Sequence, residues 1–213
     1  MEENKIYLDD LIDRLAGYQD GVVVIGRTSK SWQAHREAEK IDNNELLPLL
    51  SDTLNLLSDE NRIEALFFIL LCLAQNTKDV KIIDCMISYF ERIQLDDFDH
   101  DIRYSLMRCA TRTNLKFSGK IDSIVYWMDD DHEMVRNESI KLIGQTSNYK
   151  SEAENALIQV LECPYDDYGI RFAADSLFEV GSKKCIPYLK SVLENLEDME
   201  AISSVRRTLK KLM

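Results

Sequence analysis

Apolar residues recur at the three- and four-residue spacing of amphipathic helices from residue 43 to the end of the chain. Residues at this spacing share one helix face. One clear stripe comprises Ile170, Ala173, Ala174, Leu177 and Val180. Short turn and capping segments, such as Ser151 to Glu154, separate one stripe from the next. The pattern predicts an all-α chain of paired helices.

Two regions depart from this pattern. The segment 63–73 is apolar nearly all round, so we expect a helix that is covered on both sides. The segment 20–30 is irregular and glycine-containing, and it follows a predicted helix at 5–17. We therefore divide the chain into an N-terminal helical and irregular segment, residues 1–42, packed on a repeat domain, residues 43–213.

An apolar residue followed by arginine opens several helices at nearly equal intervals. Ile102, Val135, Ile170 and Val205 are separated by 33, 35 and 35 residues, and each precedes an arginine. A single helical hairpin cannot bury its apolar face alone, so neighbouring hairpins must cover it. These intervals indicate stacked helix pairs.

The repeats resemble the HEAT-repeat family of α-solenoids. The segment 167–181, DYGIRFAADSLFEVG, resembles the first helix of that repeat, and the segment 184–193 resembles the second, with Pro187 near its start. The likeness is good over residues 98–212, weaker over 43–93 and absent over 1–42. It implies a right-handed α-solenoid (superhelix) of about five HEAT-like hairpins. It also implies a structural ladder that includes Arg103, Arg136 and Arg171.

The formal net charge is −12, which disfavours a general nucleic-acid binder and favours encounter with basic partners. The longest apolar run, 65–74, is too short to span a membrane. No signal peptide is visible. The five cysteines are scattered and odd in number, so we expect them to be reduced thiols. We therefore expect a cytoplasmic, bacterial protein.

No catalytic constellation is recognisable. The chain has no Cys-x-x-Cys pair, and its three histidines lie far apart in sequence. Its many carboxylates offer no distinctive pairing for acid–base chemistry. We expect no catalytic residues, no cofactor and no metal.

Acidic residues cluster at each junction between the second helix of one hairpin and the first helix of the next, which we call a handover. Stacking should line these clusters along one edge. An Asp before a helix often caps it. Three consecutive aspartates at 129–131 exceed what one cap needs, which favours a docking surface for a basic protein. The clusters are Asp96, Asp97, Asp99 and Asp101; Asp129, Asp130, Asp131 and Glu133; Asp166 and Asp167; and Glu194, Glu197, Asp198 and Glu200.

Aromatic residues flank two of these clusters, and aromatic side chains are common anchors in protein interfaces. Alternatively, they pack between adjacent repeats. The candidate partner-binding residues are Asp97, Asp99, Tyr126, Trp127, Asp129, Asp130, Asp131, Tyr165, Asp166, Asp167 and Tyr168.

These observations favour a non-enzymatic protein-binding module that recognises a basic protein, for example an adaptor or an immunity-type inhibitor of a basic toxin. One alternative is a HEAT-like enzyme, similar to DNA alkyl-base glycosylases or bilin lyases, with its site in the concave groove. Another is an oligomer subunit that uses the apolar helix 63–74 or an uncapped end of the repeats as its contact.

Overall fold

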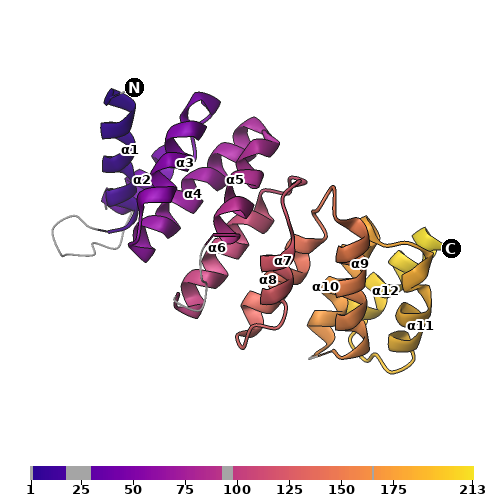
Figure 1. Ribbon diagram of the computed structural model, residues 1–213. Coiled ribbons are helices and arrows are strands. Elements are labelled where there is room, and N and C mark those ends of the chain that lie inside the picture. The colour runs from indigo at the N-terminus through magenta and orange to yellow at the C-terminus, as the bar shows by residue number, and fades with distance from the viewer. Residues whose placement is uncertain (1, 18–29, 93–97, 165) are drawn as a thin grey trace. The chain divides into compact units, whose positions relative to one another are not determined.

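The computed structural model describes residues 2–17, 30–92, 98–164 and 166–213 (Figure 1). These residues form helices and contain no strand, apart from an isolated bridge between Phe117 and Thr146. Contacts divide the chain into unit 1, Met1–Leu115, and unit 2, Lys116–Met213. The fold is therefore all-α, as the hydrophobic pattern predicts.

Unit 1 is built around α4, which contacts every other α-helix of the unit. The glycine-containing stretch 20–30 lies outside the described residues except for Lys30. The helices are α1 (Glu2–Leu15), α2 (Lys30–Ala38), η1 (Asn44–Leu46), α3 (Leu47–Leu56), α4 (Glu60–Thr77), α5 (Val80–Phe90) and α6 (His100–Arg112).

The position of α4 follows from its sequence. Its start is capped by Asp59, whose Oδ1 accepts a hydrogen bond from the Arg62 amide at 2.9 Å. It ends at Thr77, and the following residue, Lys78, adopts a left-handed conformation. Between these points its apolar residues are buried, including Phe67 and Leu70. Burial of each large apolar side chain contributes about 1.5–3 kcal/mol. The prediction of a helix covered on both sides is confirmed.

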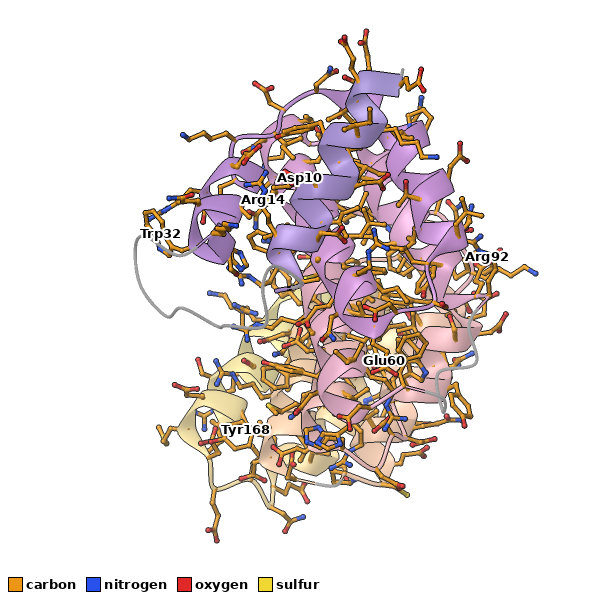
Figure 2. The ribbon with its side chains drawn as sticks, turned by 90° about the vertical axis from the view of Figure 1, so that its left-hand side faces the viewer. Asp10, Arg14, Trp32, Glu60, Arg92 and Tyr168 are labelled. Carbon is orange, nitrogen blue, oxygen red and sulfur yellow. The ribbon has the colours of Figure 1, made fainter. Side chains whose placement is uncertain are left out.

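The helices α1 and α2 pack on each other and on α4. Arg14, labelled with Asp10 in Figure 2, links the two N-terminal helices. Its Nε donates to Asp10 at 2.8 Å, and its Nη1 donates to Glu37 of α2 at 2.8 Å. The proposed boundary between residues 42 and 43 falls inside unit 1, and it stays a prediction.

The Arg14–Glu37 pair predicts a small acid sensitivity. The hydrogen bond from Arg14 lowers the pKa of Glu37 below its ordinary value. A lowered folded-state pKa stabilises the fold above the ordinary carboxyl range, and this contribution is lost as pH falls through the folded pKa. We expect Glu37→Gln to cost at most about 1 kcal/mol at pH 7. Urea unfolding of both proteins from pH 7 to pH 3 should show this difference shrinking; a constant difference would contradict the assignment.

Unit 2 places α10 between three partners, α8, α9 and α12 (Figure 1). The helix α7 packs on α8, and α11 packs on α9 and α12. The helices are α7 (Asp122–Trp127), α8 (Glu133–Ile143), α9 (Lys150–Glu162), α10 (Asp167–Val180), η3 (Lys183–Cys185), α11 (Ile186–Leu193) and α12 (Met199–Leu212).

Buried hydroxyl groups connect α8, α10 and α12. Ser176 Oγ donates to the Ile140 carbonyl at 2.7 Å, and Thr208 Oγ1 donates to the Ala174 carbonyl at 2.8 Å. Gly144 lies against Ser176 so closely that a Cβ at position 144 would lie 2.9 Å from the Ser176 Cα. Small side chains therefore allow the first helices of successive hairpins to approach each other.

The arginines of the expected ladder do not all act in the same way. Arg171 forms an ion pair with Glu200 of the following repeat. Arg136 Nη1 instead donates to the main-chain carbonyls of Asp130 and Asp131, at 2.7 and 3.0 Å. Arg171 thus supports the inter-repeat role, whereas Arg136 stabilises the loop that leads into its own helix.

Candidate functional site

A cavity of about 260 Å³ lies in unit 2 among α7, α8, α9 and the start of α10. Its apolar side chains come from α7, α8 and α9 and the segment after α7, and its lining also carries three carboxylates and one guanidinium. The principal lining residues are Val125, Met128, Asp129, Arg136, Ile140, Val160, Glu162 and Asp166.

The fold brings the predicted acidic handovers of unit 2 close to one another. Asp129 and Asp166, which come from successive handovers, line the same cavity. Asp167 Oδ2 accepts a hydrogen bond from the Asp198 amide at 3.3 Å, which joins the next pair of handovers. We call Asp129, Asp131, Glu162, Asp166 and Asp167 the acidic face of unit 2.

Helix capping accounts for part of this acidity. Asp130 Oδ1 accepts from the His132 amide at 2.8 Å, and Asp166 Oδ1 accepts from the Gly169 amide at 2.6 Å. These two carboxylates satisfy amides at helix starts, where negative charge is favourable. Asp129 and Asp131 are exposed. They remain the stronger candidates for contact with a partner.

The aromatic candidates divide into exposed and buried side chains. Tyr126 is 62% exposed and Tyr168, labelled in Figure 2 at the start of α10, is 56% exposed. Trp127 is only 1% exposed. The expectation that Trp127 anchors a partner is therefore wrong, because its ring belongs to the core of unit 2. For this residue, burial favours the packing alternative.

The acidic face of unit 2, as defined above, leaves out three of the predicted residues. Asp97 and Tyr165 lie outside the described residues. Asp99 belongs to unit 1, where its Oδ1 caps α6 by accepting from the Asp101 amide at 2.9 Å. The candidate site is therefore the acidic face of unit 2 with its two tyrosines.

Sequence reasoning missed Glu162 and the cavity that it lines. Glu162 is the last residue of α9 and is exposed, like Asp129 just after α7. Its position four residues before Asp166 was an available signal, because both residues flank one handover. The cavity itself gives no sequence pattern, since four helices contribute to it.

The electrostatics of the cavity favour a cation. Carboxylates at positions 129, 162 and 166 can accept hydrogen bonds from ammonium or guanidinium groups, and such charge-assisted bonds are strong. The one guanidinium in the lining, that of Arg136, is already bonded to two carbonyl oxygens. The apolar lining can contact the methylene groups of a lysine or arginine side chain.

A possible metal-binding group occurs elsewhere. The ligand atoms of Asp99, His100 and Asp101 lie within 4.8 Å of one another, and all three residues are exposed. Helix capping by Asp99 explains part of this arrangement. Within the described residues, no helix combines the length and apolarity that crossing a membrane requires.

No protein-family model and no curated protein sequence matches the chain. Its fold is similar to that of a designed armadillo repeat protein in complex with peptide (KR)4, with a TM-score of 0.60 and 15% identity, over 97% of this chain and 99% of that one. It is also similar to an engineered protein, with a TM-score of 0.53 and 15% identity, over 95% and 96% of the two chains. These similarities place the chain in the all-α solenoid class of helical repeat folds.

Proposed function

We propose that this protein is a non-enzymatic protein-binding module that holds a basic segment of its partner on the acidic face of unit 2. The observation that carries the proposal is the meeting of carboxylates from two successive handovers at one cavity. The exposed Tyr126 and Tyr168 are next in sequence to the lining residues Val125 and Gly169. Such a surface offers opposite charge for lysine and arginine and aromatic contacts for their neighbours.

The charge of the whole chain supports the same class of partner. A net charge of −12 attracts basic proteins and repels acidic ones before contact is made. Charges at the rim of an interface chiefly change the association rate and its dependence on salt. Removal of charge from the proposed site should therefore lower the association rate of a basic partner at low ionic strength.

The designed armadillo repeat protein supplies a physical precedent, because its structure holds a peptide of alternating lysine and arginine. Its sequence identity of 15% transfers only the fold, so the ligand class rests on the charges of this chain. We further propose that the repeats are HEAT-like, and that the protein is a bacterial cytoplasmic adaptor or immunity-type inhibitor of a basic toxin.

The cavity of unit 2 does not favour the enzyme alternative. A glycosylase-like site needs a basic rim to hold the phosphates of its substrate. The described rim is acidic, with Arg136 engaged by two carbonyl groups, and Trp127 is buried in the core. We therefore place peptide or protein recognition ahead of nucleobase chemistry.

The proposal can be tested with a fluorescent (Lys-Arg)4 peptide. The double variant Asp129→Asn/Glu162→Gln leaves the capping residues Asp130 and Asp166 in place. We expect about fivefold to tenfold weaker binding at low salt, because each partly screened charge pair contributes about 0.2–1 kcal/mol. Fluorescence anisotropy and stopped-flow association at two salt concentrations would measure the loss, most of it in the association rate.

A matched control is Asp52→Asn/Glu152→Gln. It removes the same charge from exposed positions on α3 and on the opposite end of α9 from Glu162. We expect the control to bind the peptide within about twofold of the unmodified protein, since neither residue is among those that line the cavity. Equal weakening of peptide binding by both double variants would show that net charge alone causes the effect, and it would contradict a binding site on the acidic face of unit 2.

A further inference from the structure

A second cavity, of about 320 Å³, lies within unit 1 among α1, α2, α4 and α6. Its volume is at the lower end of the range of about 300–1,000 Å³ for small-molecule pockets. The lining is mixed, with apolar side chains and a few polar groups. The residues that matter here are Leu15, His35, Glu64, Phe68, Ser105 and Cys109.

Glu64 is the only acidic residue among the described lining residues, and that lining contains no lysine or arginine. Its Oε1 accepts a hydrogen bond of 2.5 Å from Ser105 Oγ of α6. A carboxylate has room for several hydrogen bonds. A cation would therefore find both an opposite charge and remaining acceptor capacity at Glu64.

Two rings, those of His35 and Phe68, line the cavity together with Glu64. The ring centroids of His35 and Phe68 are 4.6 Å apart, and their planes meet at 71°. Partial desolvation lowers the pKa of His35, which is an exposed residue at the cavity, and the imidazole is neutral at neutral pH. Aromatic rings attract cations, and a neutral imidazole does not compete for Glu64. The cavity thus combines a carboxylate, aromatic surface and aliphatic lining from Leu15.

We propose that the unit 1 cavity binds a small free organic cation, a primary ammonium group on a compact aromatic or branched aliphatic body. The ammonium donates to Glu64, and the body packs against Phe68 and Leu15. Binding is non-covalent: burial raises the pKa of the Cys109 thiol to about 12, so it stays protonated and unreactive. This proposal does not rest on the acidic face of unit 2.

Benzylammonium is a suitable probe, with benzyl alcohol as its neutral counterpart. NMR titration of the full chain would follow the ring resonances of His35 and Phe68. We expect saturable one-to-one binding of benzylammonium, at least tenfold tighter than that of benzyl alcohol. The absence of saturable shifts at these rings, or equal affinity for the two probes, would overturn the proposal.

The matched variants are Glu64→Gln and Glu60→Gln. Glu60, labelled in Figure 2, lies one helical turn before Glu64 on α4 and is not among the residues that line the cavity. We expect Glu64→Gln to remove the tenfold preference and Glu60→Gln to keep it. The same preference in both variants would overturn the proposal.

Two further variants keep the test decisive if Glu64→Gln does not fold, as judged by circular dichroism. Ser105→Ala retains the carboxylate and frees an acceptor position, so benzylammonium should bind at least as tightly. Phe68→Leu preserves all charges and should weaken benzylammonium binding about threefold or more. Unchanged affinity in Phe68→Leu, or lost binding in Ser105→Ala, would count against the assigned contacts.

Ammonium groups also occur on the lysine side chains of peptides, so one arm uses the (Lys-Arg)4 peptide. Under the proposal, the peptide leaves the His35 ring resonances unchanged while benzylammonium shifts them. If the peptide shifts these resonances and benzylammonium does not, the cavity serves a protein segment and the small-molecule proposal fails. Loss of peptide binding at unit 2 leaves the benzylammonium result unaffected, so the two proposals fail separately.

Discussion

Replacement of Trp127 by alanine is expected to lower the free energy of unfolding by about 3–5 kcal/mol. Trp127 is among the largest fully buried side chains and ends α7, the helix that covers α8. Its removal takes away buried apolar surface and leaves a cavity that the surrounding helices fill only in part. Total stabilities are about 5–15 kcal/mol, so this loss is severe. Urea unfolding followed by circular dichroism would measure it.

Tyr126→Ala is the matched comparison, since it removes the adjacent aromatic side chain. Tyr126 is 62% exposed, and surface substitutions usually change stability by no more than about 0.5 kcal/mol. We expect near-normal stability and weaker binding of the (Lys-Arg)4 peptide. Equal destabilisation by Tyr126→Ala and Trp127→Ala would show that the burial of Trp127 is not the cause.

The second large effect is expected at Gly144. In Gly144→Ala the new Cβ would lie 2.8 Å from the Ser176 Cβ and 2.9 Å from its Cα. The backbone of α10 must move to relieve this contact, and overpacking of this kind costs about 1–3 kcal/mol. The shift would also disturb the bond from Ser176 to the Ile140 carbonyl. Urea unfolding should show a lower midpoint.

Gly169→Ala serves as its control within unit 2. A Cβ there would lie 3.5 Å from Asp166 Oδ1, which is an ordinary contact. Because Gly169 lies in α10, alanine should stabilise the helix by up to about 1 kcal/mol. The two glycine substitutions are thus expected to have opposite signs. Destabilisation by Gly169→Ala of the same size would contradict the role assigned to the Gly144–Ser176 approach.

Much of the fold could be predicted from periodicity. The burial of α4 follows from its continuous apolar run, and the handover positions follow from the repeat interval. The isolated bridge between Phe117 and Thr146 could not be predicted, because neither residue lies in an alternating pattern. It depends on two loops of successive hairpins meeting.

The candidate site was predictable only in part. The clustering of Asp129 and Asp166 at handovers follows from the sequence, but the shared cavity depends on how four helices pack. Tyr126 and Trp127 are adjacent at the end of a six-residue helix. So short an element gives too few turns for periodicity to show which ring points inward. The buried ring therefore had to be identified from the structure.

The packing of unit 2 has a consequence for its synthesis. Its main helix contacts join each α-helix to the next α-helix along the chain or to the next but one, such as α7 with α8, α9 with α10 and α10 with α12. Such local contacts favour rapid folding. Chains fold during translation at about 5–20 residues per second. Each hairpin of unit 2 would thus leave the ribosome after the preceding hairpin has folded, so that little apolar surface stays exposed during synthesis.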